Sequence, residues 1–188
     1  MRILRAFLFS AGVLAASFLA ACDDPLSLRE ASAGNVVDTI QMFALRGTPI
    51  AQPSGFHLPT RTVMRTDQPG FDIAFDIDDA GTPRIYPAGA LGLPREPGVL
   101  KVTTVFDALN SAPNVDYVDH ESIAIPPGTV FVAQSSLYGG DCGLSGALPR
   151  YGKFHVLSVN MVQRSVVIET LVNINCGYRD LQPGVPSA

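Results

Sequence analysis

Residues 71–78, with the sequence FDIAFDID, decide the fold of this chain. Phenylalanine or isoleucine occupies every second position, and aspartate or alanine fills the positions between them. A period of two matches a β-strand, whose successive side chains point to opposite faces of a sheet. We expect one face of this strand in the core and the acidic face in water. Turn residues at 79–82 precede the segment RIY at 84–86, so the stretch predicts a β-hairpin.

Short segments of the same kind recur along the chain, separated by turn residues. The 17 glycines and 15 prolines are spread throughout, as the many turns of an all-β domain require. The segment 35–45 also fits helical spacing, but its β-branched residues favour a strand. A second hairpin is predicted near the C-terminus, with one inner face made by Leu157, Val159, Met161, Val166, Ile168, Val172 and Ile174. Further strands are predicted at 60–65 (a weak edge strand in a loop from 47 to 69), 100–106, 115–118, 122–125 and 129–134, with a short helical turn at 106–111.

This pattern predicts one all-β domain over residues 35–188. Eight or nine short strands with turns about every ten residues are typical of an antiparallel β-sandwich, immunoglobulin-like in architecture, or of a small barrel. The chain has no tryptophan, and both cysteines of its mature domain lie late in the sequence. These features differ from antibody domains, so the expected likeness is architectural and implies no function.

The N-terminus is a segment of another kind. Arg2 and Arg5 precede an apolar run at 6–19, which is shorter than the roughly 20 residues that a membrane-spanning helix needs. The run ends in Leu19-Ala20-Ala21-Cys22, two small residues followed by a cysteine. This ending resembles the lipobox of bacterial lipoproteins. The resemblance implies that residues 1–21 form a signal peptide, that cleavage falls between Ala21 and Cys22, and that Cys22 carries the lipid.

The same resemblance implies a location in the bacterial cell envelope. A chain lipidated on Cys22 is anchored to a membrane without spanning it, and its domain lies outside the cytoplasm. Residues 22–34 are mostly small or polar and are expected to form a lipid-anchored tether. Asp23 resembles the signal that retains lipoproteins in the inner membrane of enteric bacteria. That rule varies between lineages, so the sequence leaves the choice between inner and outer membrane open.

The two remaining cysteines, Cys142 and Cys176, are expected to form a disulfide. An even number of cysteines in an oxidising compartment favours pairing, and two buried thiols are the alternative. Neither cysteine belongs to a CxxC motif or has a pair of histidines near it, so a redox or metal role is not predicted. A bridge would fix the glycine-rich segment 139–146 to the end of the last strand.

The other motifs in the sequence indicate no chemical site of comparable specificity. Asp76, Asp78 and Gly81 partly match a calcium loop, but Ala80 and Pro87 stand where that loop needs oxygen ligands. The acidic residues of 72–79 are therefore expected to be solvated. The segment 143–147 lacks the glycine spacing of a nucleophile elbow. No metal ligands, cofactor or catalytic residues are predicted.

Three histidines and one polar cluster remain as candidates. His120 lies between two acidic residues, His155 begins the last hairpin, and His57 lies in a proline-rich loop. Their separations match no zinc motif. Residues 173–179, with the sequence NINCGYR, are either a recognition surface or the turn that ends a strand.

Composition narrows the class of partner. The formal net charge is −4 and no two basic residues are adjacent, so nucleic acid is not an expected partner. We expect a non-catalytic structural or interaction module, anchored to the membrane through Cys22, with an unidentified envelope partner. The alternative is an envelope enzyme, or a lipoprotein that binds a small ligand or metal, using His120 or His155.

Overall fold

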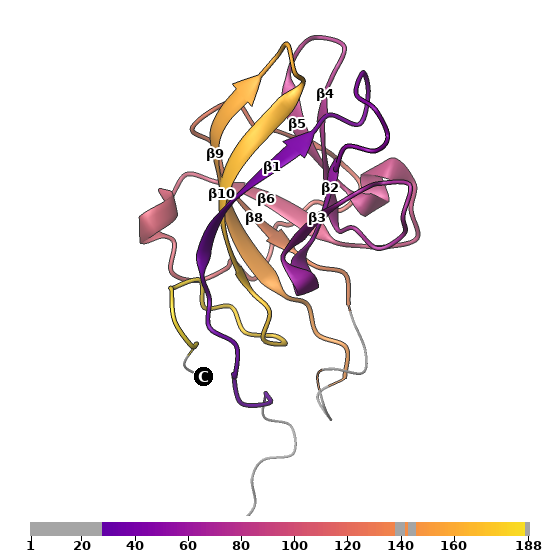
Figure 1. Cartoon of the computed structure of the whole chain (residues 1–188). Helices are drawn as coiled ribbons and strands as arrows, with labels where there is room; N and C mark the ends of the chain where they lie inside the picture. The colour runs from indigo at the N-terminus through magenta and orange to yellow at the C-terminus, as the bar shows by residue number, and fades with distance from the viewer. Residues whose placement is uncertain (1–27, 138–141, 143–145, 187–188) are drawn as a thin grey trace, which may run out of the picture.

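The computed structural model describes residues 28–137, 142 and 146–186. They form two antiparallel sheets of five strands each, packed against one another (Figure 1). The strand order is β1-β10-β9-β8-β6 in the first sheet and β3-β2-β4-β5-β7 in the second. The predicted antiparallel β-sandwich is confirmed. The predicted cleavage site at Ala21 and lipidation site at Cys22 lie outside the described residues.

The strands are short, apart from the last two. The first sheet contains β1 (Val37–Phe43), β6 (Gly98–Val102), β8 (Val130–Gln134), β9 (Tyr151–Asn160) and β10 (Ser165–Asn173). The second sheet contains β2 (Gly55–His57), β3 (Thr62–Met64), β4 (Ile73–Ile77), β5 (Pro83–Pro87) and β7 (Ile123–Ala124). Three 3-10 turns connect them: η1 (Leu58–Thr60), η2 (Ala88–Leu91) and η3 (Phe106–Ala108).

Three aromatic rings join the two sheets at the centre of the core. The rings of Phe131 and Phe154 stack with their centroids 4.9 Å apart, and Phe56 meets Phe154 edge-on at 5.6 Å. All three side chains are fully buried. Burying a side chain of this size stabilises a fold by about 1.5–3 kcal/mol. Because Phe56 comes from β2 and the other two from β8 and β9, the rings hold the layers together.

The predicted weak edge strand is present, but several neighbouring predictions differ from the structure in detail. The edge strand is β3, and its partner β2, in the same proline-rich region, was missed. The segment 115–118 contributes one bridge, between Val118 and Val99, and no strand. The segment 35–45 contains β1, so the helical alternative is wrong. β1 pairs with β10 at the edge of its sheet.

A β-bulge changes the inner face of β9. Val167 pairs with Ser158, whereas the next residue, Ile168, pairs with Val156, so Leu157 is an extra residue in its strand. A bulge of this kind shifts the alternation of side chains by one position. The prediction that Leu157 begins the inner face is therefore wrong: its side chain is exposed and Val156 is buried. In β10 the predicted inner residues Val166, Ile168 and Val172 are buried.

The strand that suggested the fold differs from its prediction in one respect. Residues 73–77 form β4 and pair with β5 as the expected hairpin. The acidic face is not in water, because Asp72 and Asp76 are 0% and 2% exposed. Ala74 lies on this face, and Leu45 from the loop before β2 and Met64 from β3 pack against the cluster that it forms with Phe71 and Ala88. Alternation in the sequence does not distinguish a face in water from a face covered by loops that offer hydrogen-bond donors.

The predicted disulfide is confirmed. Cys142 and Cys176 are bonded, with their Cα atoms 5.4 Å apart, a separation normal for a disulfide. Cys142 is buried, and Cys176 lies just after β10. The bond ties the segment after β8 to the end of the last strand.

Removing this bond is expected to destabilise the domain. A crosslink between residues 34 positions apart restricts the unfolded chain and contributes about 3–4 kcal/mol to the free energy of unfolding. We expect a Cys142→Ala/Cys176→Ala variant to unfold at correspondingly lower urea concentration than the oxidised protein. Adding reductant should lower the midpoint of the wild type and leave the variant unchanged. Equal midpoints for all four samples would contradict a stabilising bond.

Candidate functional site

Two of the three candidate histidines lie at the surface of the domain. On β9, the Nδ1 atom of His155 is 3.2 Å from Oε2 of Glu169, its partner across the sheet, and its ring stacks on Phe106 with centroids 6.2 Å apart. The largely exposed His120 lies with Nδ1 3.6 Å from a carboxylate oxygen of Asp119. Neither histidine lines the three pockets described below.

A buried carboxylate, Asp72, lies immediately before β4. Oδ2 of Asp72 accepts a hydrogen bond from the backbone N–H of Leu58 (2.9 Å), and Oδ1 accepts from the N–H of Ser136 (3.2 Å) and from Nη2 of Arg95 (3.1 Å). Burial raises the pKa of the Asp72 carboxyl, and these donors together with His57 oppose that shift. Burial also lowers the pKa of His57, although the charge of Asp72 acts in the other direction.

A second buried carboxylate lies near the end of β4. Oδ2 of Asp76 accepts from Nε of Arg46 at 2.7 Å, and Oδ1 accepts from the backbone N–H of the same residue at 3.2 Å. Nη2 of Arg164 lies 3.6 Å from Oδ1 and donates to the carbonyl of Ile77. Nε of Arg164 donates to the carbonyl of Arg46 at 2.7 Å. We call Asp76, Arg46 and Arg164 the Asp76 network; it joins the loop after β1 to the turn between β9 and β10.

These partners correct the prediction of a solvated acidic face. Asp79 alone is highly exposed, and it pairs with Arg46 at 3.0 Å. Asp78 accepts hydrogen bonds from the backbone N–H groups of Ala80 and Thr82 within the turn, which lowers the pKa of its carboxyl. Among the described residues, no group of three or more histidine, cysteine, aspartate or glutamate side chains could hold a metal ion.

One lysine is buried under the segment that contains η3. The ammonium of Lys153 donates to the carbonyls of Phe106 (2.8 Å) and Leu109 (3.1 Å), and it lies 4.5 Å from the centroid of the Phe106 ring. Burial lowers the pKa of Lys153, and the carboxylate of Asp107 is the largest opposing influence. The ammonium therefore fixes the covering segment to the outer face of β9.

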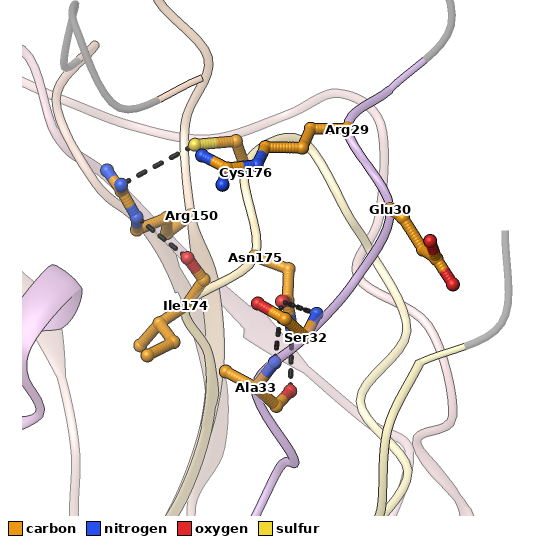
Figure 2. A pocket seen from close by; sticks show the side chains of 8 residues that line it. All are labelled: Arg29, Glu30, Ser32, Ala33, Arg150, Ile174, Asn175 and Cys176. Atoms are coloured by element: carbon orange, nitrogen blue, oxygen red, sulfur yellow. Dashed lines mark hydrogen bonds between the residues drawn. The ribbon is translucent and has the colours of Figure 1, made fainter. Parts of the chain in front are cut away.

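A small pocket of about 180 Å³ lies where the N-terminal segment meets the disulfide (Figure 2). Asn175 organises it: Oδ1 accepts from the backbone N–H groups of Ser32 (3.0 Å) and Ala33 (3.1 Å), and Nδ2 donates to the carbonyl of Ala33 (2.8 Å). Nη2 of Arg150 contacts the sulfur of Cys176 at 3.5 Å. We call this pocket beside Asn175 the basal pocket. The last residues of the predicted tether, 32–34, therefore contact the domain directly.

The polar segment 173–179 provides most of these internal contacts. Asn173 accepts from the backbone N–H of Asn175 and donates to the carbonyl of Asp180. Arg179 donates to the carbonyl of Ala112, and Tyr178 is buried. Most of its polar groups are thus used within the fold, which favours the interpretation of this segment as the turn that ends a strand.

Two further pockets lie elsewhere on the surface. One, of about 300 Å³, adjoins the buried Asp72 and is lined by Pro94, Arg95, Glu96, Ser136 and Leu137. The other, of about 500 Å³, lies beside the end of β1, next to the Asp76 network. We call it the distal pocket, lined by Gln41, Phe43, Gly47, Thr48, Pro49, Gln52 and Gln163. Sequence reasoning missed it because its residues are dispersed and match no motif.

No protein-family model matches this chain, and no curated protein is significantly similar to it. The described part of the chain contains no helix with the length and apolar character of a membrane span. Residues 143–145 of the segment compared with a nucleophile elbow lie outside the described residues.

The surroundings of Asp72 predict a particular response to pH. Its pKa is raised above the value near 3.8 of an ordinary carboxyl, so the folded state binds the proton more tightly than the unfolded state. The stability that Asp72 contributes is therefore greatest below pH 3.8 and is lost as the pH rises through the raised pKa. We expect the free energy of unfolding of the wild type, relative to Asp72→Asn, to fall as the pH rises from below 3.8 through the raised pKa of Asp72.

Urea unfolding of both proteins across this range measures the difference. At neutral pH we expect Asp72→Asn to be less stable by about 1–3 kcal/mol, because its single amide oxygen replaces two acceptors and leaves a buried donor unpaired. A difference that grows as the pH rises would contradict the raised pKa.

Proposed function

We propose that this protein is a lipid-anchored module of the bacterial cell envelope that binds a partner outside the cytoplasm and is not an enzyme. The disulfide between Cys142 and Cys176 is the observation that carries the proposal. Structural disulfides persist in oxidising compartments and are rare in the cytosol of most bacteria. The lipobox-like sequence that ends in Cys22 supports the anchor.

The contacts of the N-terminal segment define how such an anchor would hold the domain. Ser32 is the first residue with a hydrogen bond to Asn175, and it follows Cys22 by ten residues. Ten residues span at most about 36 Å when fully extended. Lipidation of Cys22 would therefore keep the basal pocket close to the bilayer. The opposite end, with the turns between β4 and β5 and between β9 and β10, would face away from it (Figure 1).

The surroundings of the titratable groups support a non-catalytic role. Asp72, Asp76 and Lys153 are buried, and each is engaged by several hydrogen-bond or ion-pair partners of the fold. A catalytic acid, base or nucleophile must reach a substrate in a pocket. These three side chains instead hold loops against the two sheets.

The alternative proposal is an envelope enzyme or ligand-binding lipoprotein that uses His155 or His120. One observation favours it, the contact of 3.2 Å between His155 and Glu169, which is within reach of proton transfer. The ring of His155 stacks on Phe106, and the pair lies on the outer face of its sheet. We therefore place this alternative second.

The anchor is tested by replacing the lipidated residue. We expect Cys22→Ala, expressed in a bacterial host, to lose labelling by radioactive palmitate and to leave the detergent phase in Triton X-114 partitioning. The matched control is Cys142→Ala/Cys176→Ala, which removes the other two cysteines and should keep both properties. Unchanged labelling and partitioning of Cys22→Ala would overturn the proposed anchor.

A further inference from the structure

The side chains of the distal pocket are positioned by the register of β1. Ile40 and Met42 point into the core, so Gln41 and Phe43 point to the outer face of the sheet. Side chains two positions apart on a strand lie about 6.5–7 Å from each other on the same face. An amide and an aromatic ring therefore stand side by side at the end of β1. Gln163, in the turn between β9 and β10, lines the same pocket.

The Asp76 network holds the two sides of this pocket together. The backbone N–H of Ala44 donates to the carbonyl of Arg164 at 2.8 Å, and Arg164 donates to the carbonyl of Arg46. Gly47 adopts a φ of 76°, and a Cβ atom there would lie 2.8 Å from Nε of Arg164. Glycine adopts this positive φ without strain and leaves room for the Arg164 side chain. The loop and the turn are thus fixed relative to one another, which gives the pocket a defined shape.

The lining has hydrogen-bonding capacity but no ionisable side chain. Three glutamine amides accompany the ring of Phe43 and the ring of Pro49, while the hydroxyl of Thr48 donates to the carbonyl of Ala44 at 2.6 Å. Oε1 of Gln163 accepts from Asn160 at 3.2 Å, which leaves its amino group for another acceptor. Within the described part of the chain, the side-chain amide of Gln52 has no hydrogen-bond partner. An amide offers both donors and acceptors, the combination that hydroxyl groups complement.

We propose that the distal pocket binds a neutral oligosaccharide. Sugar hydroxyls match the glutamine amides, and the apolar face of a sugar ring matches Phe43 and Pro49. A volume of about 500 Å³ lies within the usual range of small-molecule pockets. With no charged group in the lining, the pocket offers no compensation for the desolvation of an ionised ligand.

A peptide ligand is the main competing class, and the backbone argues against it at this position. Extended peptides bind most readily by adding a strand to a free sheet edge, and β1 is an edge strand. Beside the pocket, however, the N–H of Phe43 already donates to the carbonyl of Pro53 at 2.9 Å. A peptide strand cannot form its backbone hydrogen bonds where this contact exists. Recognition at the distal pocket therefore falls to side chains.

This inference rests on the proposed function in one respect, because it names a ligand class for the interaction module. Anchoring at Cys22 would turn the distal pocket away from the membrane. Binding itself needs no anchor, so the test can be made on the full chain in detergent. Failure to bind a glycan leaves the palmitate result intact, and loss of the anchor leaves the binding result intact.

The experiment is isothermal titration calorimetry with cellopentaose, chitopentaose and maltopentaose as neutral probes and a capped pentaalanine as the peptide probe. We expect saturable binding of at least one oligosaccharide and none of the peptide. Raising the salt concentration from about 0.05 to 0.5 M should leave the affinity unchanged, because no ionised side chain lines the pocket.

Variants locate the binding to the pocket. We expect Gln52→Ala/Gln163→Ala to weaken binding at least tenfold, and Phe43→Leu, which keeps an apolar side chain but removes the ring, to weaken it severalfold. Gln68→Ala, an exposed glutamine outside the pocket, is the matched control and should bind normally. The proposal is overturned if none of the oligosaccharides binds, if the pocket variants bind as the wild type does, or if the peptide binds instead.

Discussion

Two buried carboxylates, Asp72 just before β4 and Asp76 within it, are the constraint on which the rest of the structure depends. Moving an ionised carboxylate out of water costs several kcal/mol unless hydrogen bonds and opposite charges replace the lost hydration. Asp72 and Asp76 have such partners, and the partners come from loops and turns instead of neighbouring strands. Because they lie at opposite ends of one short strand, the two carboxylates organise the two ends of the sandwich separately.

The two ends consequently have different characters. At one end Asp72 draws together the segments after β2 and β8, close to the disulfide and to the basal pocket where Asn175 holds the N-terminal segment. At the other end Asp76 fixes the loop after β1 against the last turn and so shapes the distal pocket. Under the proposed function, the first end would serve for attachment and the second for recognition.

Period-two alternation and cysteine parity predicted the fold class, most strands and the disulfide between Cys142 and Cys176. The alternation reflects the local geometry of a strand, and the even number of cysteines reflects their pairing chemistry. The burial of Asp72 and Asp76 was not predictable, because it depends on donors from loops distant in sequence. The bulge at Leu157 was missed because side chains alternate regularly on both sides of it. Only the face to which the alternating side chains point changes at the bulge. The distal pocket matches no sequence motif. Its glutamine side chains come from separate segments, and hydrogen bonding by amides requires no fixed spacing between residues in the sequence.

Amide hydrogen exchange, measured residue by residue by NMR, tests most directly whether the two carboxylates act separately. In Asp76→Asn we expect the amides of Ala44 and Arg46 to exchange at least tenfold faster than in the wild type, because both belong to the loop that this carboxylate fixes. The amides of Leu58 and Ser136 should keep their rates, and Asp72→Asn should give the reverse pattern. Uniform acceleration in either variant, or none, would contradict the account.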